Sequence, residues 1–265
     1  MVRVIINADD FGKSLERNRA IDDAFKQGLI SSANMIVTGQ YLQDAVNKAV
    51  EGGYLNKLHI HFNLATNLLH ENSNDIPLTE GIKKDSYFCK DGKFIKYHGL
   101  PKSFLSIRKW KVVYNELEGQ YKKFIEITQG QANYNHIDFH LWYNLTWPGA
   151  IALRRFTKKH KILSVRYLTI LQQKNWKNKF FCLLSSRQGV MSVSSCSIFY
   201  FVNNWRSLLG NVVIELFCHP NYKDGVFLDD TPSYLNYEER RPMQQIIDEL
   251  RKLEKIEYIS WEDYV

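Results

Sequence analysis

Carboxylate and imidazole side chains follow several apolar segments of the chain, in a pattern that could hold a metal ion. Asp9 and Asp10 come shortly after an apolar run at residues 2–6. Later segments carry, in chain order, His61 and Asn63, then His136, Asp138 and His140, and then Glu215 and His219. One carboxylate with two imidazoles leaves coordination positions open for water and substrate, as divalent-metal hydrolases require. The residue types therefore favour a metal site, with a satisfied core histidine as the alternative for any one imidazole taken alone.

Other kinds of catalytic site find little support in the sequence. It contains no glycine-rich phosphate loop, no serine nucleophile elbow and no dinucleotide-binding fingerprint, which argues against phosphoryl transfer, serine hydrolysis and hydride transfer. The cysteines are widely spaced and form no Cys-x-x-Cys pair, so neither a thiolate zinc site nor a redox couple is expected. Free thiols in a reducing compartment fit this spacing best.

Apolar periodicity predicts strands that alternate with helices. From Ser14 the pattern turns helical, and Gly28 lies where a C-terminal cap would lie. The ranges predicted as strands are 2–6, 33–37, 58–64, 135–139, 163–168, 212–217 and 256–259. Further helical patterns cover residues 42–50, 108–127 and 243–253.

This alternation predicts an α/β fold with a parallel sheet. About seven strand–helix units in one chain favour a closed or nearly closed (β/α) barrel, with a doubly wound open sheet as the alternative. A barrel carries its active site in the loops after the carboxyl ends of the strands, which is where the acidic and histidine residues lie. We expect one domain over residues 1–265, with the polar stretch at 69–101 as a loop insertion over one face.

The composition is that of a folded globular protein, with 45% hydrophobic and 24% charged residues. The first residues lack the features of a secretory signal, and no apolar run is long enough to span a bilayer, so we expect a soluble, cytoplasmic protein without a membrane partner. The formal net charge of +7 raises the question of nucleic acid. The basic clusters at 102–111, 158–161 and 174–179 are short and scattered, so no nucleic-acid partner is expected.

Five segments resemble motifs of the YdjC-like carbohydrate deacetylases, in the same order along the chain. Residues 7–12 read N-A-D-D-F-G, and residues 28–34 read G-L-I-S-S-A-N. Residues 60–64 (I-H-F-N-L), 136–140 (H-I-D-F-H) and 215–220 (E-L-F-C-H-P) are similar to the family's L-H-L-N-L, H-I-D-S-H and E-L-M-C-H-P segments. The resemblance spans nearly the whole chain.

The resemblance implies a distorted (β/α) barrel, similar to a TIM barrel, that hydrolyses an acetamido group on a sugar with one divalent metal ion. The metal ligands that it implies are Asp10, His61 and His140. Asp9 matches the general base, and His219 matches the general acid that protonates the leaving amine. Arg166 matches an arginine that orients Asp9, with a surface salt bridge as the alternative. For the Asp9–Asp10 pair, the alternative is an aspartate-rich turn that caps the following helix.

One segment departs from the family pattern. The family continues H-I-D-S-H-Q-H-V-H, whereas here His140 is followed by Leu141, Trp142, Tyr143 and Asn144. The three implied ligands are intact, so metal binding should persist. Trp142 and Asn144 in place of histidines should change the wall of the pocket, and with it the choice of substrate or the rate.

We therefore expect a hydrolase that removes the N-acetyl group from an acetylated amino sugar or short oligosaccharide and releases acetate. The alternative is a catalytically silent carbohydrate-binding protein on the same barrel. The expected partners are one divalent ion, zinc or magnesium, and a small N-acetylated sugar. The oligomeric state stays open, with a homodimer among the options.

Overall fold

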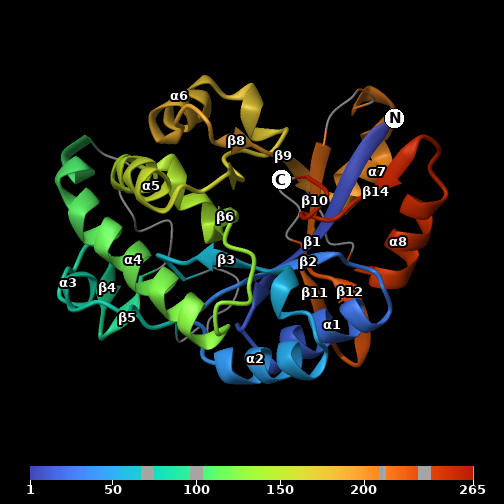
Figure 1. Ribbon diagram of the computed structural model, residues 1–265, viewed down its shortest axis with the longest axis horizontal. Coiled ribbons are helices and arrows are strands. Elements are labelled where there is room, and N and C mark those ends of the chain that lie inside the picture. The colour runs from blue at the N-terminus through green and yellow to red at the C-terminus, as the bar shows by residue number, and fades with distance from the viewer. Residues whose placement is uncertain (67–74, 96–103, 209, 211–212, 232–239, 265) are drawn as a thin grey trace.

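The computed structural model describes residues 1–66, 75–95, 104–208, 210, 213–231 and 240–264. Figure 1 shows strands at the centre of the molecule with helices around them. The helices are α1 (Leu15–Lys26), α2 (Leu42–Glu51), α3 (Glu80–Lys83), α4 (Trp110–Ile127), α5 (Trp147–His160), α6 (Trp176–Ser185), α7 (Ile198–Asn204) and α8 (Met243–Arg251). No helix in the described ranges is both long and apolar enough to cross a membrane.

The main sheet is parallel, and its strand order follows the chain around a barrel. In spatial order its strands are β8 (Met191–Ser192), β7 (Ser164–Val165), β6 (His136–Phe139), β3 (Leu58–Phe62), β2 (Ser32–Met35), β1 (Val2–Phe11), β10 (Val213–Cys218) and β9 (Ser194–Ser197). A bridge between Thr169 and Ser195 brings the segment after β7 against β9, at the opposite end of this order. The sheet is therefore a nearly closed barrel, which confirms the predicted fold class and leaves no support for the doubly wound alternative.

Within the residues that the structure describes, the barrel order contains eight strands, compared with the predicted seven. The short strands β8 and β9 carry M-S and S-S-C-S, so they lack the apolar run by which a buried strand is recognised. The last predicted strand is present as β14 (Ile256–Tyr258), but it pairs with β1 outside the barrel order.

The start and end of the first predicted helix are confirmed. The Ser14 side chain accepts a hydrogen bond from the Arg17 backbone N–H at 3.2 Å, which is a standard N-terminal cap. Gly28 follows the helix with φ +63°, and the N–H of Leu29 then donates to the carbonyl of Ala24 at 2.9 Å. The helix therefore ends at a fixed place and turns the chain toward β2.

The stretch at 69–101 contains short elements in its described part rather than loop alone. It carries α3 and a hairpin of β4 (Cys89–Lys90) and β5 (Lys93–Phe94), while residues 69–74 and 96–101 lie outside the described residues. Buried Ile82, Phe88 and Phe94 join the hydrophobic core. That this stretch is an insertion stays a prediction.

A small antiparallel sheet follows β10 and packs against α1. Its strands are β11 (Pro220–Lys223), β12 (Val226–Asp229) and β13 (Arg241–Pro242). Pro220 pairs with Asp229 across the β11–β12 hairpin. The hairpin therefore brings Asp229, at the end of β12, next to His219, the residue between β10 and β11.

Candidate active site and metal centre

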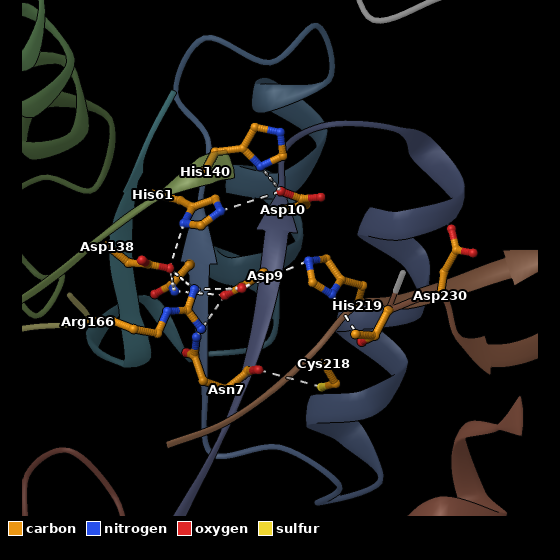
Figure 2. A network of polar contacts seen from close by, with 12 residues as sticks. Asn7, Asp9, Asp10, His61, Asp138, His140, Arg166, Cys218, His219 and Asp230 are labelled. Atoms are coloured by element: carbon orange, nitrogen blue, oxygen red, sulfur yellow. Dashed lines mark hydrogen bonds and ion pairs between the residues drawn. The ribbon is translucent and has the colours of Figure 1, made fainter. Parts of the chain in front are cut away.

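A bulge at the end of β1 lets two consecutive carboxylates face the interior of the barrel. Side chains on a regular strand alternate between its faces. Between Ala8 and Phe11, however, β1 contains one residue more than its partner β2, and Asp10 adopts φ +71°. This extra residue redirects the chain, so Asp9 and Asp10 belong to one polar network (Figure 2).

The turn after the bulge depends on a glycine. Gly12 adopts φ +101°, and a Cβ atom there would lie 2.8 Å from the carbonyl oxygen of Ile36. The N–H of Gly12 also donates to the Asn18 side chain at 2.7 Å, which ties the turn to α1. Only glycine adopts this conformation without strain, so the N-A-D-D-F-G motif is in part a backbone requirement.

Asp10, His61 and His140 meet at the carboxyl ends of three strands, as predicted. Nδ1 of His140 lies 2.9 Å from Oδ1 of Asp10, and Nε2 of His61 lies 3.6 Å from the same oxygen. The three side chains are buried, and their ligand atoms lie within 4.8 Å of one another. Figure 2 shows both rings directed at Asp10. This donor set fits a divalent ion that prefers nitrogen and oxygen ligands.

The carboxylate of this set is ionised. Burial raises the pKa of Asp10, but the Lys13 ammonium and the His140 ring outweigh burial and hold that pKa well below its usual range. Nζ of Lys13 lies 3.4 Å from Oδ2 of Asp10 and 3.2 Å from Nε2 of His140. Oδ1 of Asp10 is therefore an anionic oxygen that faces two ring nitrogens.

Asp138 orients the imidazole of His61. Nδ1 of His61 lies 3.0 Å from Oδ2 of Asp138, a close charge contact without hydrogen-bond alignment, and Nε2 lies on the side of Asp10. Burial lowers the pKa of His61 to about 3, which keeps the ring neutral near pH 7. A neutral imidazole beside a carboxylate is the arrangement that metal-binding histidines need.

A second group of Asp9, His61 and Asp138 also brings its donor atoms within 4.8 Å. Arg166, however, contacts Oδ2 of Asp9 at 2.6 Å and also contacts Oδ2 of Asp138. A guanidinium already neutralises these two carboxylates, and a metal ion between them would be repelled by it. The group formed by Asp10, His61 and His140 is therefore the better candidate for a metal centre.

Both carboxylate oxygens of Asp9 accept hydrogen bonds. Oδ2 accepts from Arg166, while Oδ1 accepts from Asn34 at 2.8 Å and from Asn7 at 3.1 Å. Burial raises the pKa of Asp9, but Arg166 outweighs burial, and the net pKa is lower than usual. Asp9 is thus an ionised carboxylate in a fixed orientation, and it does not serve as the cap of α1, which is Ser14.

Arg166 is buried, so the alternative of a surface salt bridge is wrong. Besides Asp9 and Asp138, its guanidinium donates to Oε1 of Glu215 at 3.2 Å. Its Cζ atom lies 5.6 Å from the ring centroid of Trp142 and 5.2 Å from that of Phe217. The guanidinium therefore binds three carboxylates within an aromatic surround, which fixes its position.

His219 follows β10 and approaches Asp9 from a neighbouring strand. Its Nε2 lies 3.9 Å from Oδ2 of Asp9, and Figure 2 shows the two side chains facing one another. Burial lowers the pKa of His219, and the carboxylates of Asp10 and Asp9 offset this only in part. Its side chain is 16% exposed, against 5% or less for Asp9, Asp10 and His61. His219 is thus the member of the network nearest to solvent.

Trp142 and Asn144, which replace histidines of the family pattern, occupy different environments. Trp142 is partly buried beside Arg166, consistent with a role in the pocket wall. Asn144 is fully buried, and its amide donates to the backbone carbonyl of Tyr167 at 2.8 Å. Asn144 therefore ties the segment after β6 to the segment after β7, and its expected effect on the pocket wall stays a prediction.

Some residues of the network were given no role in the sequence analysis. Asp138 had a signal, since it alternates with His136 and His140 in H-I-D-F-H and should share their face of the strand. Asn34 also had one, because it ends the G-L-I-S-S-A-N motif. Lys13 had none, since its contact with His140 joins residues 127 positions apart.

Known proteins are similar to this chain over most of its length. The family model described as YdjC-like protein matches residues 3–254. A carbohydrate deacetylase of Clostridium beijerinckii is 24% identical over 262 residues, covering 98% of this chain and 95% of that protein. A chitooligosaccharide deacetylase of Salmonella paratyphi B is 25% identical over 239 residues, covering 87% of this chain and 86% of that protein.

A solved structure has the same fold. It is an Enterococcus faecalis protein described as a putative cellobiose-phosphate cleavage protein, and it matches with a TM-score of 0.72 at 19% identity, covering 99% of this chain and 98% of that one. At this identity the likeness bears on the fold alone, and it agrees with the nearly closed barrel. Because the family model extends over nearly all strands and through every residue of the network described above, the chain belongs to the YdjC-like protein family.

Proposed function

We propose that this protein is a metal-dependent hydrolase that removes the N-acetyl group from an acetylated amino sugar or short oligosaccharide. The named relatives of the chain are carbohydrate and chitooligosaccharide deacetylases. The observation that carries the proposal is the placement of Asp9, held by Arg166, between the metal centre and His219. Amide hydrolysis needs this combination of a base, an electrophilic centre and an acid.

Asp10, His61 and His140 would hold the ion. When bound there, one divalent ion, zinc or magnesium, supplies Lewis acidity that polarises an amide carbonyl and lowers the pKa of water. Burial keeps the His61 ring neutral, and Asp138 lies at its Nδ1 side while Nε2 faces Asp10. The donor set suits several divalent ions, so the choice between them is left to measurement.

Asp9 is the proposed general base. Its carboxylate is ionised and oriented by Arg166, Asn34 and Asn7. It takes a proton from the attacking water as the new C–O bond forms at the acetyl carbon. Arg166 acts through Asp9 by holding the carboxylate in this orientation, since its own contacts are with buried carboxylates.

His219 is the proposed general acid. The C–N bond breaks when the amine nitrogen gains a proton, and this leaves acetate and the free amino sugar. Nε2 of His219 lies 3.9 Å from Oδ2 of Asp9, so the proton taken from water has a short path to the imidazole. The greater exposure of His219 is consistent with a position between the buried base and an entering sugar.

Acetate release tests this proposal directly. Protein stripped with a chelator should release no acetate from N-acetylglucosamine or short chito-oligosaccharides, and resupply of single divalent metals should restore release. Asp9→Asn should lower kcat about 10²- to 10⁴-fold while the ion content stays that of the wild type. If Asp9→Asn keeps wild-type kcat, Asp9 is not the base.

The silent carbohydrate-binding alternative makes a different prediction. Folded protein with a full complement of ion would then release no acetate from any of these sugars, yet would bind them in calorimetry. That result would reject the hydrolase proposal and retain the barrel as a binding scaffold.

A further inference from the structure

A hydroxyl and a carboxylate lie behind His219, on the side of the ring that faces away from Asp9. Nδ1 of His219 lies 3.1 Å from Oγ1 of Thr231, and Thr231 Oγ1 lies 2.5 Å from Oδ1 of Asp229. The same Asp229 oxygen accepts from the backbone N–H of His219 at 2.8 Å and from that of Thr231 at 3.0 Å. The β11–β12 hairpin creates this arrangement by pairing Pro220 with Asp229.

These contacts determine where the hydrogen atoms lie. A backbone N–H can only donate, so the Asp229 oxygen that accepts two of them is not itself protonated. The hydrogen between Thr231 and Asp229 therefore belongs to the Thr231 hydroxyl. A hydroxyl has one hydrogen, so Thr231 can only accept from His219, and Nδ1 of His219 must carry a proton.

A proton on Nδ1 determines the state of the other ring nitrogen of His219, Nε2. With the proton of the neutral ring on Nδ1, the lone pair lies on Nε2, and Nε2 is the atom 3.9 Å from Asp9. This is the nitrogen that must first receive a proton and then pass it to the leaving amine. The opposite tautomer would direct an N–H at Asp9 and a lone pair at Thr231, and could not accept the proton.

We infer that Thr231 is a positioning residue, which with Asp229 holds His219 in the Nδ1–H tautomer so that Nε2 is ready to exchange the catalytic proton. This inference rests on the proposed role of His219 as the acid. The Thr231 hydroxyl is not needed to fix the backbone here, because Asp229 already accepts hydrogen bonds from the backbone N–H groups of His219 and Thr231. Its specific effect is on the imidazole.

The test compares Thr231→Val, which keeps the side-chain shape without the hydroxyl, with Thr231→Ser, which keeps the hydroxyl. We expect kcat to fall about 10- to 100-fold in Thr231→Val with KM within about twofold, and to stay within about threefold in Thr231→Ser. Thr157→Val is the matched control, since within the described residues the Thr157 hydroxyl bonds to the Arg154 carbonyl on α5 alone, and its loss should leave kcat unchanged. If Thr231→Val does not fold, Thr231→Ala takes its place.

Nitrogen-15 NMR of the histidine rings gives a readout that needs no substrate. The wild type and Thr231→Ser should show His219 as the Nδ1–H tautomer, assigned by loss of its signals in His219→Gln. Thr231→Val should shift the ring toward Nε2–H. A valine variant with the wild-type tautomer, or with wild-type kcat, would overturn the inference. Absence of acetate release by the wild type would instead overturn the proposed function, and the NMR comparison would still decide whether Thr231 sets the tautomer.

Discussion

His59 and His61 lie two residues apart on β3 and face the same barrel interior, yet their surroundings differ. Both are buried, and burial lowers the pKa of each to about 3. His61 contacts the carboxylates of Asp138 and Asp10. His59 instead packs edge-on against aromatic rings, at 5.2 Å from His136 and 5.4 Å from Trp261. Both positions have a buried imidazole, so burial of an imidazole does not by itself make a metal site. The neighbouring carboxylates distinguish His61.

The same contrast holds for two clusters of side chains stacked along the barrel axis. The carboxyl-end cluster consists of Asp9, Asp10, His61, Asp138, His140 and Arg166. The amino-end cluster consists of His59, His136, Glu215 and Trp261. In the latter, His136 stacks on Trp261 at 3.8 Å between ring centroids.

The clusters differ most in the charge of their carboxylates. Cations near Asp9 and Asp10 outweigh burial and lower both pKa values. For Glu215, burial outweighs its contact with Arg166 and raises the pKa to about 7. An ionised carboxylate next to a neutral imidazole can bind a metal ion, whereas a carboxyl group that is about half protonated near pH 7, beside a stacked ring, is a poorer ligand. Each of the following changes tests this difference.

The largest effect is expected from substituting the two histidines of β3 in separate variants. His61→Ala should remove the bound ion and lower kcat/KM about 10³-fold or more, because it deletes a proposed ligand. His59→Leu should keep both the ion and the activity, since it replaces one neutral buried group with another. Metal content by mass spectrometry and acetate release check both variants. Loss of the ion from His59→Leu would show that ion binding also needs the amino-end cluster.

A smaller effect is expected at the contact that distinguishes His61. Asp138→Asn should weaken ion affinity about 10- to 100-fold, because the neutral amide removes the negative charge beside Nδ1 of His61. Titration of the chelator-treated variant with zinc measures this affinity, with Glu215→Gln as the control that leaves it unchanged. Equal affinities in Asp138→Asn and wild type would remove Asp138 from the metal centre.

The smallest effect concerns the stability of the amino-end cluster. The pKa of Glu215 is raised in the folded state to about 7 from 4.5, so its stabilising contribution is complete below pH 4.5 and is lost as the pH rises toward 7. Glu215→Gln does not titrate, and its stability relative to wild type should rise by about 1–3 kcal/mol between pH 5 and pH 8. Urea unfolding at both pH values measures this. The same difference at both pH values would contradict the raised pKa.

Much of the fold and the membership of the carboxyl-end cluster were predictable from local patterns. The apolar runs that end in Asp9–Asp10, His61 and His140 mark the carboxyl ends of parallel strands, and such ends meet at one edge of a barrel. The strands β8 and β9 were missed because they are short and rich in serine. They form strands because they pair with neighbouring strands of the sheet, which local sequence does not reveal.

The remaining features depend on register and long-range contact. The extra residue of β1 at Asp10 exists only relative to β2, so no local pattern reveals that both carboxylates turn inward. Thr231 meets His219 because of the pairing in the β11–β12 hairpin. Asn144 matches a family histidine in sequence position, yet its backbone partner at Tyr167 lies 23 residues away.

Anomalous X-ray diffraction from crystals grown with zinc, recorded at the zinc absorption edge, tests the central claim most directly. We expect one strong peak bounded by Asp10, His61 and His140, and no peak beside His59 and His136. A peak between Asp9 and Asp138, a peak in the amino-end cluster, or no peak within the barrel would contradict it.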